Sequence, residues 1–141
     1  MVCDKTVDSI MSVDLITGTV GDSFTSARDK ISNNFIHHLP IISESKKLLG
    51  IISESDILRV DFSDRFSNRE KSDLLLNKMV KIPDIMTINV IKLHAGDQVC
   101  YAIELFKNNL FHALPVVSLD NTLIGMITPN DIISYLYYHA A

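Results

Sequence analysis

Apolar side chains between residues 22 and 34 recur every three or four positions. Phe24, Ala27 and Ile31 fall on one face at this spacing, which predicts a helix that buries this face. Asp22 or Ser23 can cap the first turn, because a short polar side chain accepts a hydrogen bond from the free backbone N–H groups there. The sequence therefore predicts an amphipathic helix early in the chain.

Two short apolar runs follow this helix. Residues 39–42 and 48–52 are separated by the polar turn 43–47, a pattern that predicts an antiparallel hairpin. A brief strand is expected around Leu15-Ile16, and another helix is expected from about Ser55. The predicted unit is thus strand–helix–strand–strand–helix.

The same order of elements occurs again 75 residues later. Residues 8–60 align with 83–135 without a gap and share 17 identical pairs over 53 positions, where chance would supply about three. In the second copy, Asp97 is the expected helix cap. A repeated unit of this size seldom buries its apolar face alone, so the two copies should fold together.

These patterns divide the chain into three parts. The first copy spans residues 1–60, a linker spans 61–80, and the second copy spans 81–141. Within the linker, Leu74-Leu75-Leu76 with Met79 predicts a short helix that packs back on the core.

Each copy ends in the same stretch, which joins a glycine, an apolar run, a hydroxyl residue and, three positions later, an aspartate. Ser53 and Asp56 are the polar pair of the first copy, and Thr128 and Asp131 are that of the second. The pattern predicts a buried strand that turns directly into a helix. Free N–H groups and the helix dipole attract an anion at such a start, and the hydroxyl and carboxylate can hold a sugar diol.

Composition and charge exclude several other functions. The net charge is −4, from 13 basic and 17 acidic residues without a block of like charges, which argues against a nucleic-acid partner. The histidines at 37, 38, 94, 112 and 139 are scattered, so no metal site is predicted, and no catalytic constellation stands out. We therefore do not expect an enzyme.

The two cysteines and the apolar runs bear on location. Cys3 and Cys100 do not form a Cys-x-x-Cys pair, so neither a disulfide framework nor a zinc site is predicted, and lone thiols are easiest to keep in a reducing compartment. No signal core is present at the N-terminus, and no run approaches the roughly 18 apolar residues of a membrane span. A soluble cytoplasmic protein is expected.

Taken together, the motifs resemble a tandem pair of cystathionine-β-synthase (CBS) domains, called a Bateman module. The matching stretches are Asp-Ile-Met-Thr at 84–87 and its looser counterpart at 8–12, His-His-Leu-Pro-Ile-Ile at 37–42 and His-Ala-Leu-Pro-Val-Val at 112–117, and both glycine-to-aspartate stretches. The resemblance implies an α/β (α+β) fold in which two β-α-β-β-α repeats pack sheet to sheet about a pseudo-two-fold axis. It also implies a regulatory module that binds adenosine compounds such as AMP, ADP, ATP or S-adenosylmethionine, and that often forms a homodimer.

The resemblance further implies two clefts, each drawing on both copies. One would use Thr6, Ile10, Met11, His112, Thr128, Asn130 and Asp131, and the other His37, Ser53, Ser55, Asp56, Lys81, Ile85 and Met86. The aspartates would accept hydrogen bonds from ribose hydroxyls, and the hydroxyl residues would contact the ribose or the α-phosphate. The isoleucines and methionines would sandwich the adenine, while the histidines and Lys81 would face phosphate.

Simpler interpretations of these residues stay open. The aspartates and their hydroxyl partners could only cap helices, the histidines could lie at the surface, the methionines could fill the core, and Lys81 could simply be solvated. Arg59 follows the first motif, but Ser134 takes its place in the second, so a ligand with several phosphates would be poorly neutralised and AMP is favoured.

Two functions from different classes remain. The first is a regulatory sensor of an adenine nucleotide or S-adenosylmethionine-like molecule, which needs no cofactor and acts on an unknown regulated protein. The alternative is a ligand-free dimerisation or scaffold module, which the tyrosines at 135, 137 and 138 would suit because tyrosine is enriched at interfaces.

Overall fold

The fold is known from a computed structural model that describes residues 1–109 and 111–140. The chain forms two compact units, which we call unit 1 (Met1–Leu15 with Ile91–Ala141) and unit 2 (Ile16–Val90). Each unit combines the body of one sequence copy with the opening segment of the other, residues 6–12 or 81–87. The units therefore cross the boundaries between the sequence copies.

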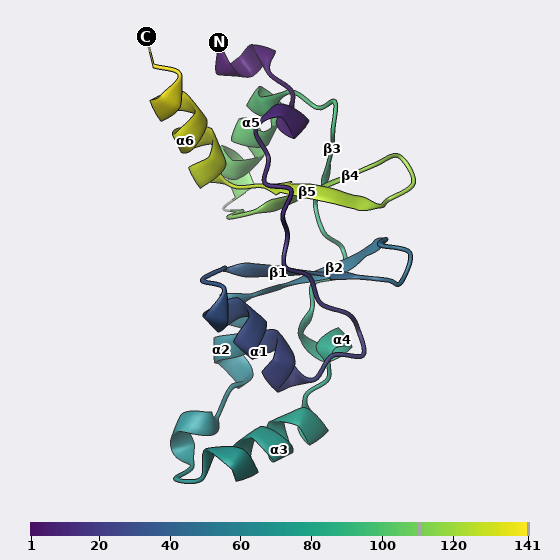
Figure 1. The fold of residues 1–141 in the computed structure, drawn as a ribbon, viewed down its shortest axis with the longest axis vertical. Helices are drawn as coiled ribbons and strands as arrows, with labels where there is room; N and C mark the ends of the chain where they lie inside the picture. The colour runs from purple at the N-terminus through teal and green to yellow at the C-terminus, as the bar shows by residue number, and fades with distance from the viewer. Residues whose placement is uncertain (110, 141) are drawn as a thin grey trace. The chain divides into compact units, whose positions relative to one another are not determined.

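Unit 2 holds the predicted hairpin. Strand β1 (His38–Ile42) pairs antiparallel with β2 (Leu48–Ser53), with Leu39 opposite Ile52. Helices α1 (Phe24–Asn33) and α2 (Glu54–Val60) accompany it (Figure 1). The predicted cap is confirmed at Ser23, whose side chain accepts from the Ser26 N–H. The core is closed by fully buried side chains of Phe24, Leu39, Ile41, Ile52, Leu76 and Ile82.

Unit 1 repeats this plan. Strands β3 (Leu93–His94), β4 (Leu114–Val117) and β5 (Leu123–Ile127) form a sheet in that order, with β3–β4 parallel and β4–β5 antiparallel. Helices α5 (Val99–Asn109) and α6 (Pro129–Tyr138) accompany the sheet. Its core contains Val7 from the opening segment together with Leu93, Val99, Leu114, Val116 and Ile127. The predicted α+β fold is confirmed.

Each opening segment pairs with the sheet of its unit through a single antiparallel backbone bridge. Ser12 exchanges backbone hydrogen bonds with Met126 at 2.9 and 3.0 Å, and Thr87 does the same with Ile51 at 2.9 and 3.0 Å. The glycine of each motif permits this close approach. A Cβ at Gly50 would lie 2.8 Å from the Thr87 carbonyl oxygen, and one at Gly125 would fall on the Met11 sulfur.

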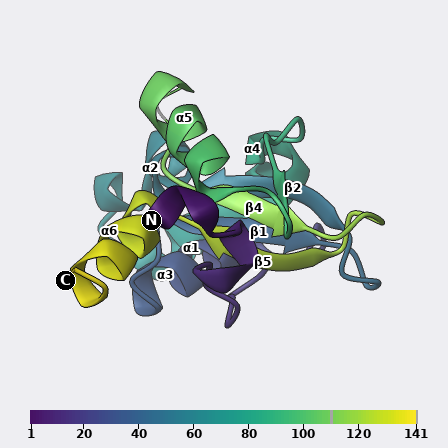
Figure 2. The same ribbon diagram turned by 90° about the horizontal axis from the view of Figure 1, so that it is seen from above.

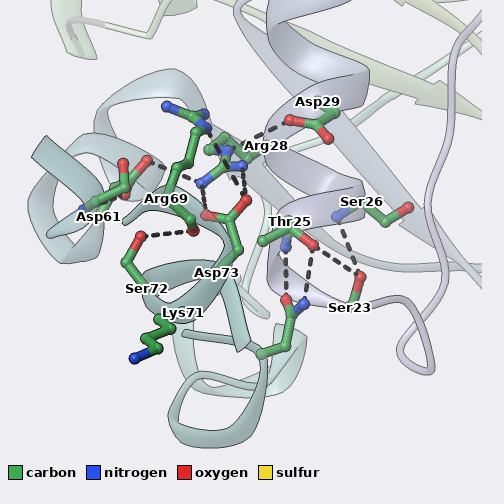
Figure 3. A network of polar contacts seen from close by, with 12 residues as sticks. Ser23, Thr25, Ser26, Arg28, Asp29, Asp61, Arg69, Lys71, Ser72 and Asp73 are labelled. Atoms are coloured by element: carbon green, nitrogen blue, oxygen red, sulfur yellow. Dashed lines mark hydrogen bonds and ion pairs between the residues drawn. The ribbon is translucent and has the colours of Figure 1, made fainter. Parts of the chain in front are cut away.

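The linker helix predicted around Leu74–Met79 is confirmed as α3 (Arg69–Met79), which follows the 3₁₀ turn η3 (Ser63–Arg65) and precedes α4 (Ile82–Ile85). Leu76 is fully buried against the unit 2 core. Arg28 of α1 donates two hydrogen bonds to the carboxylate of Asp73 at 2.9 and 3.0 Å (Figure 3). Together these contacts fix α3 on α1.

The N-terminal turn η1 (Val2–Asp4) takes a comparable position in unit 1, beside α5, as Figures 1 and 2 show. Here one prediction was wrong. Cys3 and Cys100 are joined as a disulfide, with their Cα atoms 4.8 Å apart, rather than standing as separate thiols. Their separation of 97 residues gave no pairing signal, because only the fold brings η1 to the first turn of α5.

Two smaller expectations also need correction. The strand expected around Leu15-Ile16 is absent from the described residues, and the pairing there is a single parallel bridge from Gly18 to Ile41. Asp97 lies before α5, and its carboxylate accepts from the His94 N–H at 2.8 Å, closing a turn.

Among the helices that the structure describes, none is both long and apolar enough to cross a membrane.

Candidate functional site

The start of α2 is held by a capping box. Ser53 is the N-cap, and its hydroxyl accepts from the Asp56 N–H at 3.1 Å, while the Asp56 carboxylate accepts from the Ser53 N–H at 2.8 Å. This reciprocal pair satisfies two backbone donors that the first turn of a helix leaves free. The capping interpretation is therefore correct for both residues. It uses only one carboxylate oxygen of Asp56.

The start of α6 has the same geometry. The Thr128 hydroxyl accepts from the Asp131 N–H at 3.3 Å, and Asp131 Oδ2 accepts from the Thr128 N–H at 2.8 Å. Pro129 occupies the first helical position, where its missing N–H leaves no unsatisfied donor. Both carboxylates thus stand at equivalent places with one oxygen, Oδ1, directed to a different partner.

The partner of that second oxygen differs between the units. In unit 1, the Ser12 hydroxyl donates to Asp131 Oδ1 at 3.1 Å, which links the helix start to the opening segment of the other copy. In unit 2, Asp56 Oδ1 accepts from Arg59 on its own helix. The Arg59 side chain is 71% exposed, so it can leave this contact at small cost.

The opening segments carry the apolar residues that the resemblance assigns to adenine. Ile10 and Met11 are half-buried against the unit 1 core, and Ile85 and Met86 are half-buried against the unit 2 core. Each methionine lies against the motif glycine of its sheet. These residues therefore contribute to the cores, and the methionines lie against the strands β2 and β5 that lead into the two helix starts.

The three residues expected to face phosphate, His37, His112 and Lys81, differ in their surroundings. His37 is exposed, and its Nδ1 lies 2.7 Å from a carboxylate oxygen of Glu54. His112 is also exposed, and Pro129 fills the place that corresponds to Glu54. Lys81 Nζ donates to the Asn77 carbonyl at the end of α3, so this lysine has a partner within unit 2.

The remaining expected residues lie nearby in the chain. Ser55 and Asn130 occupy the second position of α2 and α6, and both are exposed. Thr6 caps the turn η2 (Val7–Ser9), and its hydroxyl donates to Asp8. Unit 1 therefore contains all seven residues of one expected set and unit 2 all seven of the other.

Two residues that touch these sites are not among those expected from the sequence. Ser12 contacts Asp131, and Glu54 contacts His37. The signal for Ser12 was present, because Ser12 aligns with the threonine of the Asp-Ile-Met-Thr motif at the spacing of 75 residues. No group of three or more His, Cys, Asp or Glu suited to a metal occurs within the part of the chain that the structure describes.

Two solved structures are similar to this chain over nearly its whole length. The CBS domain pair of protein MJ0100, in complex with 5′-methylthioadenosine and S-adenosyl-L-methionine, is 28% identical, with a TM-score of 0.75 and coverage of 97% of this chain and 98% of that one. CBSX2 in complex with AMP is 25% identical, with a TM-score of 0.80 and coverage of 94% and 96%.

Curated relatives are often longer. An uncharacterised protein of Methanocaldococcus jannaschii is 28% identical over 133 residues, which are 94% of this chain but 47% of the relative. Of an inosine-5′-monophosphate dehydrogenase from the same organism, also 28% identical, the chain spans 25%. The CBS domain family itself matches residues 7–63 and 82–138. This chain therefore belongs to the CBS domain family and carries two copies of the domain.

Proposed function

We propose that the protein is a regulatory module that binds an adenosine-containing ligand, AMP being favoured, at the helix starts of both units. One observation carries the proposal: the hydroxyl–aspartate capping box occurs twice, each time beside an opening segment from the other copy. Capping alone explains one oxygen of each aspartate. It does not explain why both boxes adjoin an apolar opening segment.

The carboxylates suit a ribose. An ionised carboxylate has about four lone-pair sites, and the capping bond occupies one of them. Asp56, which also accepts from Arg59, could therefore accept hydrogen bonds from both hydroxyls of a sugar diol without losing the cap. Asp131 also accepts from the hydroxyls of Thr128 and Ser12, so one of these two would have to give up its hydrogen bond to a diol. The flat adenine would lie against the half-buried Ile10 and Met11 in unit 1, or Ile85 and Met86 in unit 2.

The charge around the sites favours a small ligand charge. Each helix start offers an N–H at its second residue, Ser55 or Asn130, to one phosphate. Arg59 is paired with Asp56, and Lys81 is bound to the Asn77 carbonyl. Among the described residues of the two candidate sets, Lys81 is the only basic residue besides the histidines, and Arg59 would have to leave Asp56 to reach a phosphate. We therefore expect a monophosphate or nucleoside-like ligand to bind more tightly than ATP. The AMP, 5′-methylthioadenosine and S-adenosyl-L-methionine named for the two similar structures agree with this expectation.

The proposed role is regulation and not catalysis. The longer relatives include enzymes of which this chain matches only a part, as in the dehydrogenase. We propose that ligand occupancy biases the arrangement of the two units and that a partner protein responds to it. Such a bias requires different ligand affinities for the two arrangements.

Titration calorimetry with AMP and ATP tests the proposal. Asp131→Asn and Asp56→Asn keep a carbonyl oxygen for the capping bond and remove the anionic acceptor, so each should abolish binding at its own site with little loss of stability. Asp97→Asn is the matched control, because the Asp97 carboxylate also accepts a backbone N–H, that of His94, but belongs to the turn before α5 and not to the start of α2 or α6. The contact of Asp97 with the opening segment is made by its backbone carbonyl, which the change leaves intact. Undiminished AMP binding by the Asp131→Asn, Asp56→Asn double variant would refute the proposed sites. Tighter binding of ATP than of AMP would refute the charge argument.

A ligand-free scaffold remains the second candidate because of one surface. Helix α6 exposes Ile133, Leu136, Tyr137 and Tyr138, of which the tyrosines are 77% and 78% exposed. Aromatic residues are enriched at interfaces, so this face suits a homodimer or another protein. A panel of adenosine compounds that leaves the melting temperature unchanged, together with a dimer lost in Tyr137→Ser, would favour the scaffold.

A further inference from the structure

The disulfide between Cys3 and Cys100 joins the N-terminal turn of unit 1 to helix α5, whose Val99 and Ala102 are fully buried in the core. Cys3 lies in η1, a turn of three residues, and Cys100 lies in the first turn of α5. Both residues are half-buried, so reductants and low-molecular-weight disulfides can reach the pair. Apart from the disulfide, no residue of η1 is fully buried, and Val2 packs against the unit 1 core while only partly buried. The attachment of η1 to α5 therefore depends strongly on this bond.

The segment that η1 begins leads directly to the candidate site. The Lys5 carbonyl accepts from the Val99 N–H at 2.9 Å, and the Val7 N–H donates to the Asp97 carbonyl at 2.8 Å. Further along, Ser12 contacts Asp131. The disulfide that holds Cys3 to α5 should therefore also limit the motion of Thr6 and of the residues that follow it.

Unit 2 contains a natural counterpart that cannot respond to redox conditions. Thr25 aligns with Cys100 at the spacing of 75 residues, and it forms hydrogen bonds with Asn77 of the linker helix α3. The Thr25 N–H donates to the Asn77 side-chain oxygen at 2.9 Å, and the Asn77 amide donates to the Thr25 hydroxyl at 3.0 Å. In both units, the segment just before an opening segment is thus attached to the first helix of the other copy. Only unit 1 does so through sulfur.

We propose that Cys3–Cys100 is a reversible thiol–disulfide switch that fastens residues 1–12 to unit 1. Oxidation by a low-molecular-weight disulfide such as glutathione disulfide proceeds by two exchanges. One cysteine thiolate attacks the glutathione disulfide and releases one glutathione thiolate, and the other cysteine then attacks the mixed disulfide and releases the second. Two electrons pass to glutathione, and the two protons lost by the cysteines are taken up by the two leaving thiolates. Disulfides that solvent reagents can reach are more often labile and regulatory than deeply buried ones.

The effect on ligand binding rests on the proposed function. The opening segment is also held by the buried Val7 and by the pairing of Ser12 with Met126, so reduction should increase the fraction of time that it is detached and not release it fully. The apparent affinity of the unit 1 site then falls in proportion to the attached fraction. We expect AMP binding to weaken by about threefold or more in unit 1. The unit 2 site, which is fastened by Thr25 and Asn77, should not change.

Hydrogen exchange on the full chain tests the switch without any ligand. Peptides from residues 1–15 should lose protection on reduction with dithiothreitol and regain it with glutathione disulfide, while peptides from α3 should not change. The double variant Cys3→Ser, Cys100→Ser should show the same protection as the reduced protein, and neither reagent should change it. Equal protection of residues 1–15 in the two states would overturn the proposal. So would a bond that stays intact at every ratio of reduced to oxidised glutathione, because it would then be a permanent staple.

Calorimetry then separates this inference from the proposed function. Asp56→Asn leaves only the unit 1 site, and its AMP affinity should fall on reduction. Asp131→Asn leaves only the unit 2 site, whose affinity should stay constant. If neither variant nor the unmodified chain binds AMP in either state, the proposed function fails, and the exchange result alone decides whether the switch exists. AMP binding by Asp56→Asn that is indifferent to reduction would refute the coupling of the switch to the site.

Discussion

The two units solve one structural problem by different means. In each, the segment that comes just before an opening segment must be held on the first helix of the other copy. Unit 2 uses the 11-residue helix α3, which buries Leu76 and pairs Asp73 with Arg28 (Figure 3). Unit 1 uses the three-residue turn η1 and a disulfide. The short η1 packs only the partly buried Val2 against the core and adds a covalent bond, whereas the longer α3 is held by the fully buried Leu76 and by charge.

The candidate sites differ in a similar way. Asp131 is linked to the opening segment through Ser12, whereas Asp56 is linked to its own helix through Arg59. In unit 1, the second carboxylate oxygen of Asp131 therefore has its hydrogen-bond partner only when the opening segment is in place. In unit 2 the corresponding contact is within α2, and Thr87 pairs with the backbone of Ile51 in the strand that leads into this helix.

The largest effect is expected at Arg28. This side chain is 9% exposed and lies among Asp29, Asp61 and Asp73, and its hydrogen bonds with Asp73 raise its pKa. Arg28→Ala leaves Asp73 without its main partner and opens a gap against α3, so the free energy of unfolding should fall by about 3 kcal/mol. Urea denaturation measures the loss. Asp29→Ala, which removes a more exposed partner of the same arginine, should cost under about 1 kcal/mol, and equal losses in the two variants would contradict the assigned role of α3.

The motif glycines should give the next effect, and an unequal one. Adding a methyl group to a packed interior costs about 1–3 kcal/mol. Gly50→Ala would press on the Thr87 carbonyl, which is backbone, whereas Gly125→Ala would press on the flexible Met11 side chain. Thermal denaturation should therefore show Gly50→Ala as the less stable variant. Adding Met11→Ala should relieve the Gly125→Ala clash, while Met86→Ala should leave the Gly50→Ala clash with Thr87 in place. Equal rescue in both units would show that the backbone contact is unimportant.

Much of this comparison was predictable because it follows from local pattern. The helix stripe of Phe24, Ala27 and Ile31, the two hairpins and the doubled capping motif are all encoded within about ten residues of sequence, where periodicity and caps are informative. The linker helix could be found because its leucines include the buried Leu76. These features depend on neighbours in the chain.

The contacts that the sequence could not predict all join distant segments. Cys3 meets Cys100, Ser12 meets Asp131, and Arg28 meets Asp73 only after the fold is complete. Arg28 in particular sits where the second copy has Ile103, a difference visible in the alignment but without an indication of the partner. The role of each candidate site residue in binding stays a prediction.

A smaller, pH-dependent effect should separate the two fastenings. The hydrogen bonds with Arg28 lower the pKa of Asp73 below its ordinary value of 3.8, against the opposing effect of burial. A carboxylate with a lowered pKa in the folded state stabilises that state above its unfolded pKa, and this contribution is lost as the pH falls through the folded pKa. NMR signals of α3 should therefore broaden or shift below about pH 4. The η1 contact, held by a disulfide that does not titrate, should persist. In Asp73→Asn, the acid transition of α3 should disappear; if it remains, another carboxylate controls the helix.

The smallest expected effect tests the two aspartate contacts directly. Ser12→Ala removes the hydrogen bond to Asp131 Oδ1 but leaves the backbone pairing with Met126, so the loss should be about 0.5–1 kcal/mol. Ser134 aligns with Arg59, so Ser134→Arg offers Asp131 the local partner that Asp56 has. In the Ser12→Ala background this change should recover part of the lost stability, because the arginine can satisfy the free oxygen from the same helix. It should not restore the link to the opening segment, so hydrogen exchange of residues 6–12 should stay as fast as in Ser12→Ala alone. Full recovery of both stability and exchange would mean that the contact across copies has no role of its own, and that the sites of the two units are equivalent after all.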